Sequence, residues 1–172
     1  MHDDESTRPG VPNPESAIAR AAPADSRTVP AQARWLGGTG AVPFYAFALA
    51  IWFAPPAFRD WARNALVAYG MVILAFVGAL HWGFTMKTPD FDERDRWTWM
   101  GWSVTPALAA WTASLFPFRP AVAILAAAFV VHLAVDHAFA SRSGLPPWYL
   151  RMRRALTAAV VLGLAIAFAA PA

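Results

Sequence analysis

The stretch VVHLAVDHAFASR, residues 130–142, decides the fold of this chain. It is a long apolar run that carries His132, Asp136 and His137 just before an arginine. Ionisable side chains inside an apolar segment cost free energy, so each requires a structural or functional reason. The stretch therefore predicts a membrane-spanning helix with a polar site near its end.

The composition agrees with a membrane protein. Of the 172 residues, 58% are hydrophobic and 15% are charged, whereas a soluble domain carries about 25% charged residues. The chain has no cysteine, which excludes a disulfide framework, a thiolate metal site and a cysteine nucleophile. The net charge of +3 comes from basic residues in short loops between apolar blocks, which indicates membrane topology rather than nucleic-acid binding.

Five apolar blocks predict an all-α bundle of five transmembrane helices, at residues 36–54, 65–85, 97–116, 120–140 and 155–170. Each block approaches the ~20 residues that a helix needs to cross ~30 Å of hydrocarbon. The alternation typical of a membrane β-barrel does not occur. Residues 1–34 hold five of the 15 prolines and predict a disordered cytoplasmic tail, which leaves residues 35–172 as the transmembrane domain.

The positions of arginine and lysine predict the orientation of the bundle. Eleven of the 14 lie in the tail, in the loop after the second span and in the loop after the fourth span, all on one side. Short loops rich in arginine and lysine face the cytoplasm. We therefore expect the N-terminus in the cytoplasm and the C-terminus outside.

The second and fourth spans both end at the cytoplasmic side, so their last residues share one depth. His81 belongs to the second span, and His132 and Asp136 lie four residues apart on the fourth. On the second span, His81 also continues a stripe of small and apolar residues at helical spacing, which favours a face turned toward the bundle. Further candidates for this polar layer are Ser103, Thr105, Thr157 and His137, the last of which points about 100° away from Asp136.

Several roles for this polar layer are open from the sequence. It can be a structural hydrogen-bonded network, or a site that handles protons, because a histidine titrates near neutral pH. Imidazole and carboxylate also suit a metal bound by His81, His132 and Asp136, and facing helices can ligate haem through His81 with His132 or His137. We expect no resident cofactor and assign no catalytic residue, since no nucleophile–base pair is visible.

The segment PPWYLRMRRAL, residues 146–156, alternates aromatic and basic side chains between the last two spans. We predict that it lies on the membrane surface and contacts anionic headgroups, at about 1 kcal/mol per arginine. The headgroup contacts expected there come from Trp148, Tyr149, Arg151, Arg153 and Arg154.

Five motifs together resemble a five-span family of unknown function, found in bacteria and related to mitochondrial transmembrane protein 69. They are LGGTGAVPF, GALHWG, SVTPALAAW, the late aspartate of the fourth span, and PPWYLRMRRALT. The positions that match are Gly40, Pro43, His81, Trp82, Gly83, Ser103, Pro106, Trp111, Asp136, Trp148, Tyr149 and Arg151. His132 and His137 have no counterpart in the pattern. The resemblance implies five helices in the bacterial inner membrane and no established reaction. In that membrane, the bias of arginine and lysine predicts a periplasmic C-terminus.

Two functional hypotheses follow from these features. Small size, short loops and the lack of a catalytic motif favour a non-enzymatic accessory or assembly factor, which would contact the lipid bilayer and subunits of an inner-membrane complex. The alternative is a small proton-coupled carrier that uses His81, His132 and Asp136. A cavity that reaches His81 and Asp136 would favour the carrier, whereas Asp136 locked to an arginine would favour the accessory protein.

Overall fold

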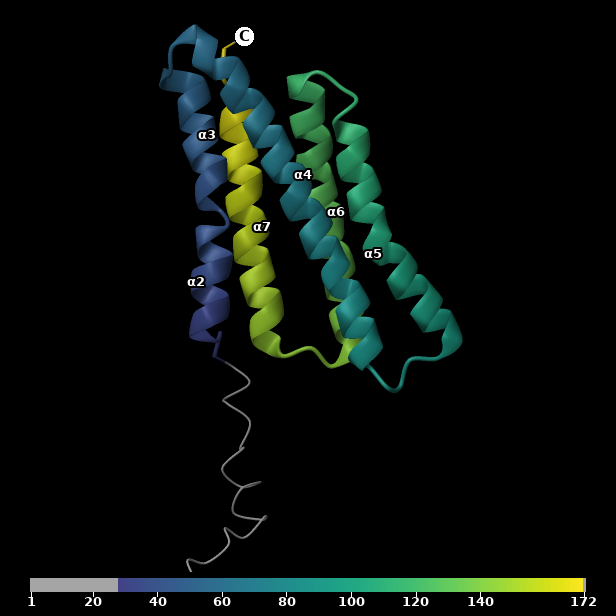
Figure 1. Cartoon of the computed structure of the whole chain (residues 1–172). Helices are drawn as coiled ribbons and strands as arrows, with labels where there is room; N and C mark the ends of the chain where they lie inside the picture. The colour runs from purple at the N-terminus through teal and green to yellow at the C-terminus, as the bar shows by residue number, and fades with distance from the viewer. Residues whose placement is uncertain (1–27, 172) are drawn as a thin grey trace, which may run out of the picture.

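The computed structural model describes residues 28–171, and within them the chain is helical with no strand. The helices are α2 (Ala31–Thr39), α3 (Val42–Phe53), α4 (Pro56–Lys87), α5 (Glu93–Ala113), α6 (Phe118–Ser143) and α7 (Pro147–Phe168). They form five passes, because α2 and α3 follow one another as a single broken pass (Figure 1). The N-terminal end of α2 and the C-terminus lie at opposite ends of the bundle, as an odd number of passes requires (Figure 1).

Three of these passes are long and apolar enough to cross a membrane among the described residues, namely Ala31–Phe53, Pro56–Lys87 and Phe118–Ser143. The chain is thus a multi-pass membrane protein in contact with the lipid bilayer. In α7, Arg151, Arg153 and Arg154 occupy the first turns, and α5 carries many tryptophans and hydroxyl side chains. Because of these polar and charged residues, α5 and α7 are not among the three helices that are apolar enough to cross a membrane.

The helix boundaries differ from the predicted spans where prolines precede a helix. Pro55 and Pro146 lie at the N-caps of α4 and α7, and a proline occupies the first turn of each. A proline in the first turn loses no hydrogen bond, so it starts a helix rather than ends one. As a result α4 and α7 begin about two turns before the predicted spans. Residues 1–27 of the predicted tail, residues 1–34, lie outside the described residues, and its last four residues belong to α2.

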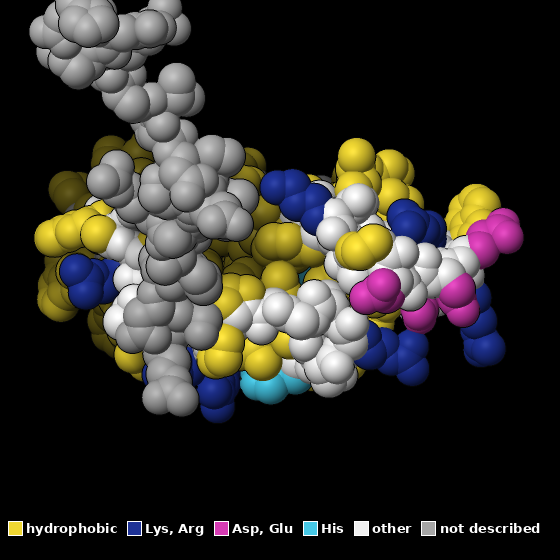
Figure 2. Space-filling view, turned by 90° about the horizontal axis from the view of Figure 1, so that it is seen from below, with side chains coloured by type: hydrophobic (Ala, Val, Ile, Leu, Met, Phe, Trp, Pro, Cys, Tyr) yellow, Lys and Arg dark blue, Asp and Glu magenta, His cyan; other side chains and the backbone are white. Residues whose placement is uncertain are grey.

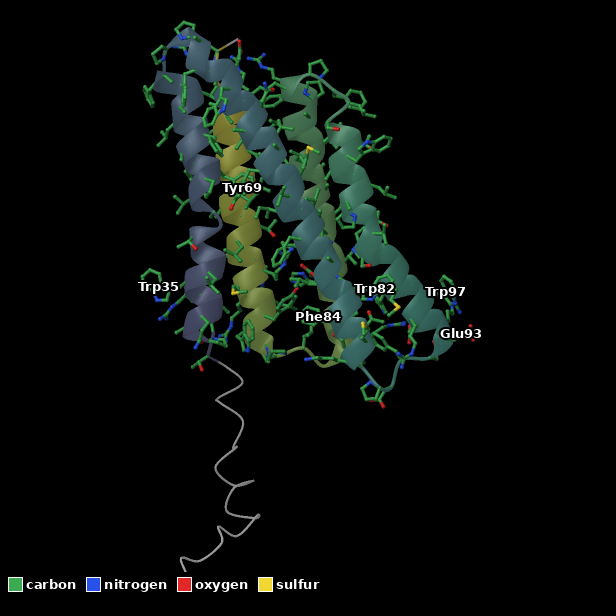
Figure 3. The ribbon with its side chains drawn as sticks, in the orientation of Figure 1. Trp35, Tyr69, Trp82, Phe84, Glu93 and Trp97 are labelled. Atoms are coloured by element: carbon green, nitrogen blue, oxygen red, sulfur yellow. The ribbon has the colours of Figure 1, made fainter. Side chains whose placement is uncertain are left out.

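The first pass breaks at Gly40 and Ala41, between Thr39 and Val42. Pro43 stands in the first turn of α3 and cannot donate a backbone hydrogen bond. The Tyr69 hydroxyl of α4 donates to the carbonyl of Gly40 at 2.9 Å, and Figure 3 shows Tyr69 directed toward the break. Non-helical backbone at membrane depth requires such partners.

An apolar core fills the half of the bundle nearer the C-terminus. Its fully buried members include Phe44, Ile51, Leu66, Leu125 and Leu164, from α3, α4, α6 and α7. The backbones approach closely where a glycine faces a neighbour. A side-chain carbon at Gly163 would lie 3.0 Å from Cβ of Phe44. Two further bonds tie α3 to α7, from Tyr45 and Trp52 to backbone carbonyls, at 2.8 and 2.9 Å.

Candidate functional site: a buried His–Asp–Arg network

Four ionisable side chains from three helices meet in the other half of the bundle. They are His81 of α4, His132 and Asp136 of α6, and Arg153 of α7, and none is more than 4% exposed. Asp136 is central. Its Oδ2 accepts a hydrogen bond from Nε of Arg153 at 2.7 Å, and its Oδ1 lies 3.5 Å from Nε2 of His81 and 3.9 Å from Nε2 of His132. We call these four residues the polar network.

Two helices deliver their side chains to this network with the same spacing. Gly70, Leu74, Gly78, His81 and Thr85 are all buried on α4, as the stripe on the second span predicted. On α7 the buried residues include Tyr149, Arg153, Thr157, Val160 and Leu164. Both sets follow the period of one helix face. The face of α7 was missed because the helix was expected to start after Arg154.

Close packing of α5 against α4 encloses the network. A side-chain carbon at Gly78 would lie 2.8 Å from Cγ of Pro106 and 3.1 Å from the Ser103 carbonyl. Only glycine permits that approach. Gly78 lies one turn before His81, so its contact with Pro106 fixes α5 against the helix that carries this histidine.

A hydrogen bond from α5 determines how the His132 ring is protonated. Nε1 of Trp102 donates to Nδ1 of His132 at 3.1 Å, and the two rings stack with an angle of 8° between them. Nδ1 must therefore carry a lone pair, which makes the ring neutral with its proton on Nε2. That proton faces the carboxylate of Asp136.

Aromatic rings separate the network from the helix ends. The Phe139 ring lies 4.8 Å from the His81 ring and 4.9 Å from the Trp99 ring, centroid to centroid. Phe84 packs edge-on against Tyr149 at 5.4 Å, and Figure 3 shows Phe84 near the end of α4 that faces α7. Rings in these positions keep water away from the ion pair and strengthen its electrostatic attraction.

Several polar atoms at the network are buried and have no hydrogen-bond partner. They are both ring nitrogens of His81, Nε2 of His132, Oδ1 of Asp136, the Tyr149 hydroxyl, Nη2 of Arg153 and Oγ1 of Thr157. Native proteins rarely leave such groups unpaired, and each one costs about 1–3 kcal/mol. A concentration of them in one region indicates a site for a polar species.

The three possible metal ligands converge, but their hydrogen bonding does not favour a metal. One ligand atom each from His81, His132 and Asp136 lies within 4.8 Å of the others. A metal-bound histidine normally donates its second ring N–H to an acceptor. His132 instead accepts from Trp102, so metal binding through Nε2 would require that bond to break.

Haem ligation is also disfavoured by geometry. The rings of His81 and His132 are in edge contact with centroids 5.0 Å apart, which leaves no room for a porphyrin between them. His137, the alternative ligand, is exposed, and its Nδ1 lies 2.8 Å from the Leu133 carbonyl. The expectation of no resident cofactor stays a prediction.

The structure separates the remaining predicted members of the polar layer. Ser103 is buried, but its hydroxyl donates to the Met100 carbonyl at 2.6 Å. Thr105 is exposed on α5 and donates to the Gly101 carbonyl at 3.4 Å. His137 faces outward. None of these three is among the four residues of the polar network, whereas Thr157 is buried and lines the cavity beside it.

The surface prediction for the segment before the last span requires correction at two residues. Tyr149 and Arg153 are 5% and 4% exposed, because the segment is the first part of α7 and turns these residues inward. Arg151 and Arg154 are exposed and Trp148 is half-buried, so headgroup contact by these three stays a prediction. The sequence allows any arginine of the loop after the fourth span as the partner of Asp136, and the structure shows that it is Arg153.

An apolar cavity of about 120 Å³ borders the network on the side of α2 and α3. Gly37, Gly40 and Ala41 line it at the break of the first pass, Val77 and Phe129 from α4 and α6, and Arg153 and Thr157 from α7. It is lined by neither histidine of the network, nor by Asp136. The cavity therefore reaches the arginine end of the ion pair.

Comparison with known proteins places the chain in a family. A family model described as "Protein of unknown function (DUF3429)" matches residues 29–169. The chain belongs to this family. Transmembrane protein 69 of Xenopus tropicalis is 30% identical over 138 residues, which are 80% of this chain and 54% of that protein. The chain thus spans about half the length of this relative. No solved structure matches the chain. The resemblance drawn from the motifs is confirmed.

Proposed function

We propose that this protein is a non-enzymatic accessory or assembly factor of an inner-membrane complex, and that α5 is the helix that contacts a partner subunit. The outward face of α5 carries this proposal. Gly101, Thr105, Leu108 and Thr112 are all exposed and recur at i, i+4, i+7 and i+11. They form one face of the helix, which we call the small-residue face.

The small-residue face suits a neighbouring helix better than lipid. Small residues let two backbones approach closely, and threonine hydroxyls can hydrogen-bond across the contact. Thr112 donates to the Leu108 carbonyl at 2.9 Å, so its oxygen remains available as an acceptor. The helix α5 is less apolar than the three candidate spans, so lipid solvates its outward face poorly. Contact with a second protein would bury this face away from lipid.

A groove beside Gly101 extends this face toward the cytoplasmic side. Trp82 of α4, Trp97 and Val104 line it, and the groove holds about 490 Å³. Trp82 and Trp97 are 48% and 76% exposed, and Figure 3 shows Trp97 at the outer side of α5 and Trp82 between the ribbons of α4 and α5. Large exposed aromatic side chains of this kind anchor protein interfaces as well as headgroup contacts.

The proposed topology has five membrane crossings with the N-terminus in the cytoplasm and the C-terminus in the periplasm of a bacterial inner membrane. The bias of eleven basic residues to one side supports it. Figure 2, seen from that end, shows dark-blue lysine and arginine side chains around the rim and magenta acids gathered on one side. The acids there are Asp90 and Asp92 of the α4–α5 connection and Glu93 and Asp95 of the first turn of α5. Acids weigh little in the orientation rule.

Site-directed photo-crosslinking in native membranes tests the partner-facing role of α5. A photoreactive residue at Thr105 or Thr112 should give one discrete adduct with another membrane protein. The same residue at Leu162, which is 55% exposed on α7, serves as the control and should contact lipid. Gly101→Leu should abolish the adduct at position 105 while the abundance of the folded protein stays unchanged. Adducts of equal yield at all positions, or none at positions 105 and 112, would refute the proposal.

A proton-coupled carrier is the second candidate, and the unpartnered atoms of His81, His132 and Asp136 favour it. Against it stands the tight pair of Asp136 with Arg153 at 2.7 Å, which already gives the carboxylate a buried counter-charge. Purified protein in liposomes with a trapped pH-sensitive dye distinguishes the two. Proton flux that is lost in His81→Gln, with the protein still folded, would establish the carrier and displace the accessory role.

A further inference from the structure

Two buried hydrogen-bond donors without partners belong to residues that line the apolar cavity. Nη2 of Arg153 and Oγ1 of Thr157 have no partner, and the two residues lie one turn apart on the same face of α7, each 4% exposed. A buried polar group that is left unpaired is costly. Both atoms can donate, so the species that would satisfy them carries an acceptor oxygen.

The charge of the site selects a neutral ligand. The guanidinium of Arg153 is already neutralised by Asp136 at 2.7 Å, and no other basic residue of the described part of the chain lines the cavity. A carboxylate or phosphate bound there would bring a second negative charge into an apolar environment without a counter-ion, which is strongly unfavourable. A carbonyl oxygen accepts from both donors and brings no charge.

The volume and position of the cavity favour a ligand with a single ring that enters from the membrane. Its volume of about 120 Å³ is close to the roughly 150 Å³ of an apolar cavity that holds one benzene ring. The flanking side chains Leu36 and Phe76 are 76% and 61% exposed on the outer surface, so an apolar tail can pass between them into lipid. The broken first pass supplies Gly37 and Gly40 at this edge, and broken helices mark ligand sites in membrane proteins.

We propose that this cavity binds the ring of a lipophilic quinone, with one quinone carbonyl accepting hydrogen bonds from Nη2 of Arg153 and Oγ1 of Thr157. The tail extends past Leu36 and Phe76 into the bilayer. This binding site does not depend on the accessory role of the protein. The same two donors could also bond to the acyl-ester carbonyl of a membrane lipid. The experiment distinguishes a quinone carbonyl from an ester carbonyl.

Equilibrium binding of a radiolabelled short-chain quinone to the full chain in phosphatidylcholine nanodiscs tests the proposal. We expect saturable retention above that of protein-free nanodiscs. Thr157→Val keeps the shape of the side chain and removes the hydroxyl, so the dissociation constant should rise by roughly three- to tenfold. Ala41→Leu fills the cavity and should remove binding. Thr98→Val, on the exposed surface of α5 and outside the small-residue face, is the matched control and should leave binding unchanged.

Thermal unfolding of the same variants separates a ligand role of Thr157 from a structural role. Without quinone, Thr157→Val removes an unpaired buried hydroxyl, and the midpoint of unfolding should stay the same or rise. Saturating quinone should raise the midpoint of the wild-type protein and shift Thr157→Val less.

Three results would overturn the proposal. The first is retention equal to that of protein-free nanodiscs, and the second is binding that neither Thr157→Val nor Ala41→Leu changes. The third is displacement of bound quinone by added diacylglycerol together with stoichiometric ester lipid in the purified protein, which would assign the cavity to an acyl ester. If Thr157→Val fails to fold, Ala41→Leu and a photoreactive quinone decide the question. Labelling of residues 36–41 or 153–160 would support the site, and labelling elsewhere would refute it.

Discussion

The two halves of the bundle are built on different physical principles. Toward the C-terminus, Phe44, Leu66, Leu125 and Leu164 pack into a continuous apolar core. Toward the opposite end, the buried space between the helices is occupied instead by the polar network of His81, His132, Asp136 and Arg153. Among the described residues the first half retains one unpaired buried polar atom, Nε of Arg63, whereas the second retains several. The contrast locates the chemistry of the molecule in the polar half and its structural support in the apolar half.

The cost of the polar half comes from burying charge. Removing a charged pair from water costs several kcal/mol per ion, and the attraction between the partners offsets this only when the geometry is good. The bond of 2.7 Å between Arg153 and Asp136 meets that condition. An apolar pair would stabilise the bundle at least as well, so stability alone does not explain the network.

Breaking the buried pair should have the largest effect. Asp136→Asn leaves the guanidinium of Arg153 buried without a counter-charge, and we expect a loss of about 3–5 kcal/mol or no folded protein. Reversible unfolding in mixed detergent micelles measures it. Asp95→Asn is the matched control, since its pair with Arg142 is exposed. A double variant, Asp136→Leu with Arg153→Met, should recover most of the stability. A loss below about 1 kcal/mol for Asp136→Asn would show that the pair is not structural.

Overpacking at the contact between α4 and α5 comes next. Gly78→Ala places a carbon 2.8 Å from Pro106, which should destabilise the protein by about 1–3 kcal/mol. Gly83→Ala, on the same helix, has nothing within 4 Å and should be neutral or stabilising by up to about 1 kcal/mol. Thermal melting of the two variants side by side provides the measurement. Equal midpoints would mean that α5 does not hold the polar half closed.

Removing the hydrogen bond to His132 should have a smaller effect. Trp102→Phe keeps a ring stacked on the imidazole but removes the donor to Nδ1, at a cost of about 0.5–1.5 kcal/mol. It also frees His132 to place its proton on Nδ1. We therefore expect added zinc to raise the melting temperature of this variant more than that of the wild-type protein. An equal response of both proteins would mean that Trp102 does not govern metal binding.

The smallest effect should come from the exposed pair between α5 and α6. Arg142 and Asp95 lie 2.9 Å apart, with Arg142 63% exposed, and Arg142→Gln should cost at most about 1 kcal/mol. High salt should abolish this difference, because mobile ions screen exposed charges. The effect of Asp136→Asn should persist in the same salt. A similar salt response of Arg142→Gln and Asp136→Asn would contradict the difference in burial between the two ion pairs.

Part of the site was predictable from residue types and spacing. His81 and Asp136 were expected at one depth because each lies near the end of its helix and the two helices run in the same direction. In the structure Nε2 of His81 lies 3.5 Å from Oδ1 of Asp136. The stripe from Gly70 to Thr85 was expected to face inward and is buried. The inward face of α7 could also be predicted from the sequence, because Tyr149, Arg153 and Thr157 recur at intervals of four residues. It was missed because the prolines at 146 and 147 were interpreted as a loop rather than as a helix start.

Helical periodicity predicts that His137 points about 100° away from Asp136, and the structure leaves it exposed while His132 and Asp136 are buried. Other features depended on distances that no pattern contains. The choice of Arg153 as the partner of Asp136 over three nearby arginines depends on how α7 packs against α6. Arginine side chains are long, and sequence position alone does not tell which of them reaches a given carboxylate.

The sequence by itself determined the helices and their alternating direction, and it placed His81 and Asp136 at one level, because these follow from apolar length and local periodicity. Only the tertiary structure decided which arginine neutralises Asp136, which nitrogen of His132 carries the proton, and that a cavity opens at the break of the first pass. Those outcomes depend on contacts of a few ångströms between helices that are remote in the chain, and no single segment encodes them.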